Sequence, residues 1–386
     1  MSSFGVVAAL ICLVMLLQPV YLCGEQNYST EQYLQGDSCN RTKRIASMLV
    51  SFINNTAAVS NAAAGLMSSE YMMVLLPLLY LIIFIVGLPA NMLAFWVLIR
   101  KNKIISSTIF LISLTVADTL LILMLPFKIA YHFSGNNWIF GEHMCRLVTA
   151  SFYGNMYASI LCLMCISIDR YIAVVHPFAA KVFRSQKMAC YGCLVLWVAV
   201  IGSMIPFCMI TQTHSIANIN ITTCHDALSS DDQAFLLPYV ITIFVVGFTL
   251  PSCVTLFCYG SVLRTLIKNK KKYLFAVKIT ALVLVMFIVC FAPSNIILVF
   301  HYSYESEHEK KDHLYYIHML SLPVSSFNSC LDPFIYYYLS DEFRSKVRSV
   351  LKCKKKSYNI SDQNTSSSSQ PKSKGTIVSA LDSCRQ

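Results

Sequence analysis

Two opposite charges stand side by side near the end of a long apolar segment. Asp169 and Arg170 close a stretch that begins near Cys145. A charge inside an apolar helix costs roughly 2.5–3.5 kcal/mol on insertion scales, so a pair of them needs a reason. A helix from Cys145 to Arg170 rises about 37 Å at ~1.5 Å per residue, and the hydrocarbon core of a bilayer is about 30 Å thick. The two ends therefore belong at opposite membrane faces, where the charges either simply reach water or carry a function.

Another acid lies deeper in the apolar sequence. Asp118 falls near the middle of a different apolar segment, with no lysine or arginine close in sequence. Two interpretations stay open: a protonated acid hydrogen-bonded inside a helix bundle, or a charged carboxylate with a partner on another segment. The polar candidates for that partner are Asn155, Ser159, Asn328 and Asp332.

The composition is that of a membrane protein. Apolar residues make up 56% of the 386 residues and charged residues only 13%, whereas soluble proteins have about a quarter charged. The net charge of +11 gathers in alternate loops, after the first, third, fifth and seventh apolar segments. This is the positive-inside bias, and it predicts an extracellular N-terminus in the plasma membrane and no role in nucleic-acid binding.

Seven apolar segments of helical length predict an all-α membrane protein, a seven-transmembrane helix bundle over residues 71–340. We expect the spans at about 72–99, 107–131, 145–170, 187–210, 234–266, 273–301 and 313–339. Each is long enough to cross the hydrocarbon core as a helix.

The segments outside the bundle differ from it in composition. Residues 1–23 are typical of a secretory signal peptide, with an uncleaved first span as the alternative. Residues 24–70 form a polar extracellular arm, residues 341–353 predict an amphipathic cytoplasmic helix with Cys353 as a palmitoylation site, and residues 354–386 lack the apolar content to fold. Glycosylation sequons on the outer side begin at Asn27, Asn40, Asn54 and Asn220.

The 16 cysteines do not form a disulfide framework. Most fall inside apolar spans, where a thiol acts as a small packing group. Only Cys39, Cys145 and Cys224 clearly face the oxidising side. That count leaves one disulfide and one unpaired cysteine.

The triplet Asp169-Arg170-Tyr171 resembles the D-R-Y motif of rhodopsin-like (class A) G-protein-coupled receptors. Four longer stretches closely resemble the proteinase-activated (thrombin-type) receptors: Leu125–His132, Phe152–Ile160, Ile221–Leu228 and Ala292–Leu298. The likeness runs from about 71 to 350 and is weak in the arm. Two positions depart from the usual receptor pattern, because Phe291 replaces a tryptophan and Asp332 replaces an asparagine.

This resemblance implies a receptor whose N-terminal arm is cut by an extracellular serine protease. The new N-terminus then acts as a tethered peptide ligand, and the bundle signals through a heterotrimeric G protein. A linked peptide has an effective concentration in the millimolar range, so a weak ligand suffices. Arrestin, receptor kinases and membrane lipid are further implied partners, and no enzymatic activity or cofactor is expected beyond an allosteric sodium ion.

The resemblance also implies roles for single residues. The inner switch is expected to consist of Asp169, Arg170, Tyr171, Tyr259 and Tyr336. A sodium site, the one metal site expected, is implied at Asp118, Asn155, Ser159, Asn328 and Asp332. The expected disulfide joins Cys145 to Cys224, and Pro293 kinks the sixth span where it can hinge.

The ligand pocket is expected beside that disulfide. Asp226 follows the second cysteine closely and is suited to receive a positive α-amino group or a basic ligand side chain, with His225 next to it. Ordinary solvated loop polarity is the alternative for both residues. Tyr131, Tyr302 and Tyr315 are candidate pocket walls near the outer ends of their spans, or interfacial aromatics of the kind common at that depth.

The arm restricts where a trypsin-like protease can cut. Its only basic residues are Arg41, Lys43 and Arg44. A cut after Arg44 exposes an apolar terminus that begins at Ile45, and this is the preferred site. A cut after Arg41, which exposes Thr42, and no productive cut at all are the alternatives. Residues 45–69 contain no acid, so a trypsin-like enzyme is favoured over thrombin.

Other functions remain as alternatives. One is a class A receptor for a diffusible lipid, nucleotide or peptide ligand, and another is a non-signalling cleavable co-receptor. A transporter or channel would show internal repeats or broken helices near the midplane, and the sequence shows neither. An enzyme is not indicated, because the polar groups of the spans include no nucleophile–base pair.

Overall fold

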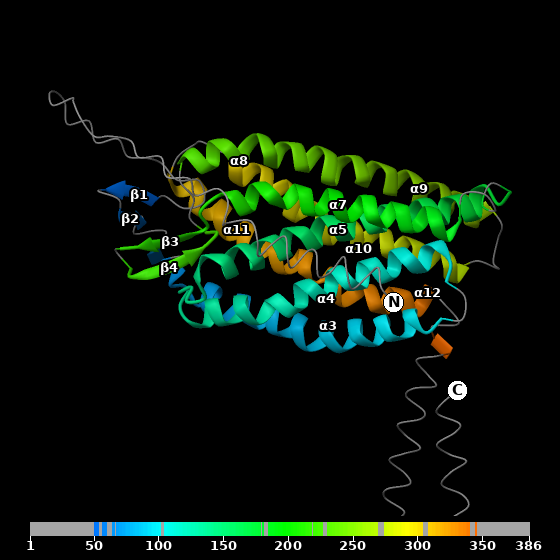
Figure 1. The fold of residues 1–386 in the computed structure, drawn as a ribbon, viewed down its shortest axis with the longest axis horizontal. Helices are drawn as coiled ribbons and strands as arrows, with labels where there is room; N and C mark the ends of the chain where they lie inside the picture. Colours follow the sequence, from blue (N-terminus) through cyan, green and yellow to red (C-terminus); the bar gives the residue numbers. More distant parts are fainter. Residues whose placement is uncertain are drawn as a thin grey trace, which may run out of the picture.

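The chain folds as a bundle of long helices with a small sheet at one end (Figure 1). The computed structural model describes residues 50–53, 56–59, 64–65, 67–101, 104–178, 180, 184–217, 219–226, 230–268, 274–303, 308–339 and 344–345. The helical elements are η1 (Tyr71–Leu75), α3 (Leu76–Ile99), α4 (Ser106–Phe133), α5 (Gly141–Val175), α7 (Gln186–Met209), α8 (Ser230–Ile243), η2 (Phe244–Thr249), α9 (Leu250–Lys268), α10 (Leu274–Ser303), α11 (His308–Ser326) and α12 (Asn328–Leu339). The strands are β1 (Val50–Ile53), β2 (Thr56–Val59), β3 (Thr213–Ile216) and β4 (Ile221–Cys224).

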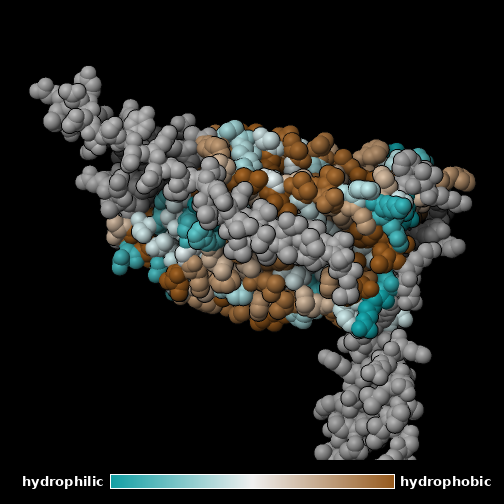
Figure 2. Space-filling model, viewed as in Figure 1, coloured by the Kyte–Doolittle hydropathy of each residue, from teal (hydrophilic) through white to brown (hydrophobic). Residues whose placement is uncertain are grey.

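The outer surface of the bundle is apolar, as lipid requires. Six helices of the described residues are long and apolar enough to cross a membrane. Large apolar side chains such as Ile85 and Val195 are more than half exposed on that surface, and Figure 2 shows the resulting apolar band between more polar ends. Helices satisfy their own backbone groups, which is why such segments can face lipid. The helices α11 and α12 together form the seventh span. The predicted seven-helix fold is therefore confirmed, and the observed bounds lie within about five residues of the predicted spans.

The fifth and seventh spans are interrupted helices. The fifth consists of α8, the π-helical turn η2 and α9, and at Gly247 in η2 an added Cβ would lie 3.0 Å from the ring of Tyr157 on α5. The seventh consists of α11 and α12, joined at Phe327, whose N–H donates to the Pro323 carbonyl at 2.9 Å. The missing side chain at Gly247 therefore allows close packing of the fifth span on α5. In the seventh span, Phe327 is the single residue between α11 and α12.

Buried polar groups fix the helices against one another. The amide nitrogen of Asn91 on α3 donates to the carbonyls of Gly87 at 3.0 Å and of Ser329 on α12 at 2.7 Å. Between α7 and α4, the indole N–H of Trp197 donates to the Ser113 hydroxyl at 2.9 Å. Hydrogen bonds of this kind set the rotation of helices that are apolar all round.

The small sheet unites two parts of the chain that are distant in sequence. Its strand order is β1-β2-β3-β4, with β1–β2 and β3–β4 antiparallel and β2 parallel to β3. The strands β3 and β4 belong to the second outer loop, which is the segment between α7 and α8 (residues 210–229), whereas β1 and β2 belong to the arm. The sequence pattern alone does not predict β1 and β2.

Candidate functional site

The second outer loop is tied to the bundle by the predicted disulfide. Cys145 in the first turns of α5 bonds to Cys224 at the end of β4, with the Cα atoms 5.7 Å apart. This confirms the expected pairing. Cys39, the expected unpaired cysteine, lies outside the described residues.

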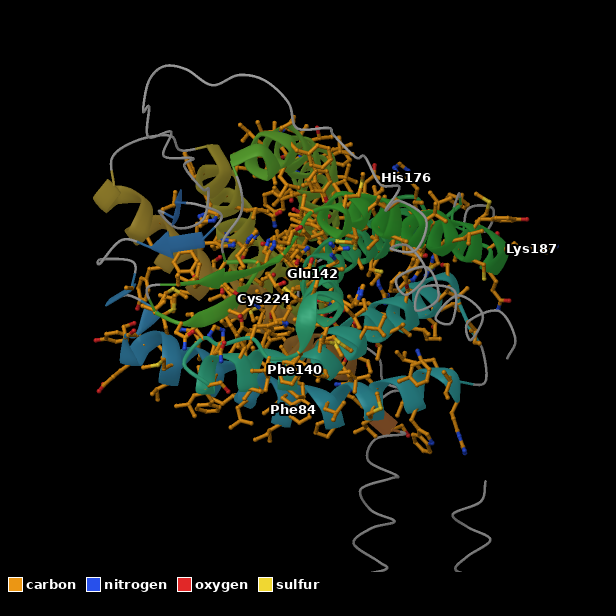
Figure 3. The ribbon with its side chains drawn as sticks, turned by 60° about the vertical axis from the view of Figure 1, so that its left-hand side comes forward. Phe84, Phe140, Glu142, His176, Lys187 and Cys224 are labelled. Atoms are coloured by element: carbon orange, nitrogen blue, oxygen red, sulfur yellow. A yellow bond between two sulfur atoms is a disulfide. The ribbon has the colours of Figure 1, made fainter. Side chains whose placement is uncertain are left out.

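Hydrogen bonds hold the same loop at two further places. The carboxylate of Glu142 accepts from the backbone N–H groups of Gln212 at 3.0 Å and Thr213 at 2.8 Å, where β3 begins. The backbone N–H of Trp138 donates to the Thr222 carbonyl on β4 at 2.7 Å. Figure 3 shows Glu142 and Cys224 at the same end of the molecule, far from His176 and Lys187. The loop is therefore fixed against the outer end of the bundle.

Asp226 is buried at the outer end of the bundle and is not a solvated loop residue. Only 3% of it is exposed. Its carboxyl group accepts hydrogen bonds from the hydroxyls of Tyr131 on α4 and Tyr315 on α11. Burial raises the pKa of Asp226, and the nearby Lys128 ammonium opposes that shift. The structure thus brings together Asp226, Tyr131 and Tyr315, three of the five residues expected in the ligand pocket.

His225, the residue before Asp226, packs among aromatic side chains. Its backbone φ is 65°, a left-handed conformation that turns the chain sharply after the disulfide. The ring packs edge-on against Tyr153 at 5.7 Å and Phe207 at 5.5 Å between centroids. Burial, with smaller contributions from the charges of Lys128 and His301, lowers the pKa of His225 to about 3. The imidazole is therefore neutral at physiological pH.

Three basic side chains near His225 and Asp226 were not among the predicted site residues. Lys128 is 7% exposed, and its ammonium lies 5.4 Å from the centre of the Tyr131 ring. His301 on α10 and His318 on α11 stack with their ring centres 4.7 Å apart. A charged residue near the end of an apolar segment is itself a signal for function, and Lys128 carried that signal. The side chain of Tyr302, the remaining expected pocket residue, lies outside the described part of the chain.

A second polar cluster lies at the middle of the bundle. Asp118 on α4 accepts hydrogen bonds from the Asn155 amide at 3.0 Å and the Ser329 hydroxyl at 2.8 Å. On α12, the Asn328 amide donates to Asp332 at 2.8 Å. Ser159 lies 3.5 Å from the Asn155 amide nitrogen. The structure thus brings together all five residues expected in the sodium site, and Ser329 is the member that sequence reasoning missed.

The two carboxyl groups of this cluster are suited to a cation. Asp118 Oδ2 and Asp332 Oδ1 are both buried, and no other described group donates to them. The two carboxyl groups lie within hydrogen-bonding distance of each other. Two buried carboxylate oxygens without donors need either a shared proton or a positive ion between them. Carboxylate and hydroxyl oxygens are hard ligands, so the donor set fits an alkali cation.

At the inner end, Asp169 is bound by a residue that the sequence did not indicate. The guanidinium of Arg184 donates to both carboxylate oxygens of Asp169, each at 2.8 Å. The hydroxyls of Ser106 and Ser107, at the start of α4, also donate to this carboxylate. The adjacent Arg170 therefore does not hold Asp169, and Nε of Arg170 is buried without a partner among the described residues.

The tyrosines expected in the inner switch separate into two groups. Tyr259 on α9 and Tyr336 on α12 are buried, 5% and 2% exposed. Tyr171 instead lies beside His176, with its hydroxyl 3.0 Å from Nε2 of that ring. Among the expected modification sites, Asn220 is exposed between β3 and β4. The expected sites that lie outside the described residues are Asn27, Asn40, Arg41, Thr42, Arg44, Ile45, Asn54 and Cys353.

Comparison with known proteins places this geometry in a family. The model of the 7 transmembrane receptor (rhodopsin family) matches residues 90–336. Human proteinase-activated receptor 3 is 43% identical over 284 residues, which is 73% of this chain and 76% of that protein. Mouse proteinase-activated receptor 4 is 43% identical over 305 residues, 79% of this chain and 76% of the relative. Human proteinase-activated receptor 1 is 37% identical over 356 residues, 90% and 82% respectively. The chain belongs to the rhodopsin family of seven-transmembrane receptors and, within it, to the proteinase-activated receptors.

Proposed function

We propose that this chain is a plasma-membrane receptor, with its N-terminus outside, that a trypsin-like serine protease activates by cutting the arm after Arg44. The new terminus at Ile45 folds back into the outer pocket as a tethered ligand. Residues 1–23 act as a signal peptide, and Asn27, Asn40, Asn54 and Asn220 carry glycans. The membership of the chain in the proteinase-activated receptors supports this proposal.

The observation that carries the proposal is the buried carboxyl group of Asp226. A cut generates one new positive charge, the α-amino group of Ile45. Burying a carboxylate is costly unless a cation pairs with it. Asp226 is the acid next to the loop disulfide. The hydroxyls of Tyr131 and Tyr315 hold it in place. In the ligand-free pocket Lys128 supplies the positive charge, so the incoming amine competes with the Lys128 ammonium.

The signal reaches a heterotrimeric G protein at the inner end through Arg170, Tyr259 and Tyr336, as α10 swings about Pro293. The unpartnered Nε of Arg170 supports this role, because Asp169 is held by Arg184 instead. A sodium ion held by Asp118 and Asp332, with Asn155, Ser159, Ser329 and Asn328 around them, stabilises the inactive bundle. The tail after residue 354 provides the phosphorylation sites for receptor kinases and arrestin, and Cys353 anchors to lipid.

The test is protease-evoked calcium release in cells that express the receptor. We expect Arg44→Ala to abolish the response to trypsin and Arg44→Lys, which trypsin still cuts, to keep it. The synthetic peptide Ile-Ala-Ser-Met-Leu-Val should activate both variants and the parent. A normal trypsin response of Arg44→Ala together with a silent peptide would refute the cut after Arg44. Retention in Arg44→Ala and loss in Arg41→Ala would move the cut to Arg41.

A further inference from the structure

The arm continues the sheet of the second outer loop. In β3–β4 alone, β3 would be an edge strand with a row of unpaired N–H and C=O groups, which is a ready site for another strand. The structure places the arm hairpin β1–β2 on that edge (Figure 1). The pairing joins Ala57 to Ile216. Adding a strand to an exposed edge is a general mode of recognition, and its affinity comes from main-chain hydrogen bonds.

We propose that residues 50–59 dock on β3 and restrain the tethered ligand, so that this hairpin must leave β3 before the new N-terminus occupies the pocket. The inference rests on the proposed cut after Arg44 and adds a regulatory contact to it. Apart from Val50, the last residue of the proposed ligand hexapeptide, the hairpin lies downstream of the ligand sequence.

The hairpin register shows which backbone groups make this contact. Ile53 pairs with Thr56, so the connection has two residues, and Ser51 pairs with Ala58. In a hairpin with such a connection, the pair next to the turn exchanges both hydrogen bonds, and hydrogen-bonded and non-hydrogen-bonded pairs then alternate. The N–H and C=O groups of Ala57 therefore point away from β1 and toward β3. This agrees with the pairing of Ala57 and Ile216.

The strand directions place the start of the hairpin far from the pocket. Because β2 is parallel to β3, β1 runs parallel to β4. Val50 pairs with Val59, two residues past Ala57, so Val50 lies beyond Ile216 at the end of the sheet opposite Cys224. The offset along the strands is about 17 Å at ~3.3 Å per residue, and the offset across three strand spacings is about 14 Å. Together these separate Val50 from Cys224 by about 22 Å.

That separation exceeds the reach of the freed segment. After a cut at Arg44, only residues 45–49 precede β1, and five residues span at most about 17 Å when fully extended. The terminus at Ile45 thus falls about 5 Å short of Cys224 while the hairpin is docked, so docking keeps it away from the part of the bundle beside the disulfide. The sheet cannot move toward the terminus either, because Glu142 holds the start of β3 and the disulfide holds the end of β4. The hairpin is the part that must detach.

The variant that tests docking is Ala57→Pro, because proline removes the N–H that points at β3 and leaves the hydrogen bonds inside the hairpin intact. Ala57→Val, which keeps the N–H, is its matched control. Both are made with Asn54→Gln, so that glycosylation near the turn does not differ. Hydrogen exchange of the purified full-length receptor is then measured for residues 50–59 and 213–217. We expect exchange to be about two- to tenfold faster in Ala57→Pro, because the loss of one backbone hydrogen bond raises the population of undocked hairpin by that factor. Ala57→Val should exchange like the parent.

The second readout tests the restraint. The trypsin concentration for half-maximal calcium release should fall about two- to tenfold in Ala57→Pro, because the undocked hairpin is more populated by that factor. The soluble hexapeptide carries no hairpin, so its potency on Ala57→Pro should equal its potency on the parent. Unchanged exchange in Ala57→Pro would overturn the docking. Faster exchange with an unchanged trypsin response would overturn the restraint. A parent that trypsin does not activate would refute the proposed cut and the restraint built on it, and the exchange measurement would still decide the docking.

Discussion

The charge of Asp226 gives the sharpest test of how the pocket recognises a freed N-terminus. We expect Asp226→Asn to lose potency for the free-amine peptide Ile-Ala-Ser-Met-Leu-Val. The substitution removes the charge but keeps side-chain atoms that Tyr131 and Tyr315 can hydrogen-bond, so the pocket keeps its shape. Asp226→Glu, which keeps the charge, is the matched control.

The expected magnitude follows from the burial of this group. Asp226 is only 3% exposed, so an ammonium that binds it is shielded from water. A hydrogen bond to a charged group contributes about 1.5–3 kcal/mol, and every 1.4 kcal/mol is roughly tenfold in affinity. The potency of the peptide should therefore fall about 10- to 150-fold in Asp226→Asn.

A double-mutant cycle separates the amine from the rest of the peptide. The assay is calcium release with the free-amine peptide and with its N-acetylated form, on the parent and on Asp226→Asn at matched surface expression. Acetylation should weaken the peptide on the parent and change little on Asp226→Asn, because the two changes remove the same interaction. If acetylation weakens the peptide equally on both receptors, the amine binds elsewhere and the reasoning is refuted.

Four further outcomes follow from the same contacts. Acidification should weaken the free-amine peptide on the parent more than on Asp226→Asn, because the carboxylate needed for binding is lost as pH falls through its raised pKa; equal pH profiles would contradict this. Arg184→Gln should lower maximal G-protein activation, because Asp169 loses its partner and can pair with Arg170. Arg184→Lys should keep the activation, and parental activation in both variants would exclude this role of Arg184. Asp118→Asn should remove the dependence of peptide potency on sodium, and a retained dependence would place the ion elsewhere. Cys224→Ala should abolish surface expression or response, because the loss of such a disulfide costs about 2–5 kcal/mol of stability; mass mapping that pairs Cys224 with another cysteine would overturn the assignment.

The helices could be read from the sequence because their signal is local. A long apolar segment must form a helix in lipid, since every backbone group needs a partner within the segment. The prediction of a span at 107–131 therefore lies within a few residues of Ser106–Phe133. The π-helical turn η2 has no such signal, and the close approach of its Gly247 to Tyr157 involves another helix.

The sites were predictable where chemistry alone restricted the partners. Buried oxygens such as those of Asp118 and Asp332 need polar neighbours, and few are available in apolar spans. Ser329 escaped because serine is also an ordinary small residue of helix interfaces. Arg184 escaped because its contact with Asp169 depends on the path of an inner loop. The arm hairpin escaped because its affinity for β3 lies in the backbone, which any sequence without proline can supply.

The seventh span physically connects the outer pocket to the buried acids. Tyr315, which donates to Asp226, and His318, which stacks on His301, are on α11. Ser329 and Asp332, which face Asp118, are on α12. Only Phe327 separates these two helices, and Pro323 lacks the N–H that would strengthen the helix before it. A ligand amine that takes over Asp226 would change the contacts of Tyr315 and so act on the span that also carries Asp332 of the proposed cation site. Movement of α11 would alter the spacing of the Asp118 and Asp332 oxygens. The peptide ligand and sodium should therefore oppose each other through this span. By linkage, each should weaken the binding of the other by the same factor.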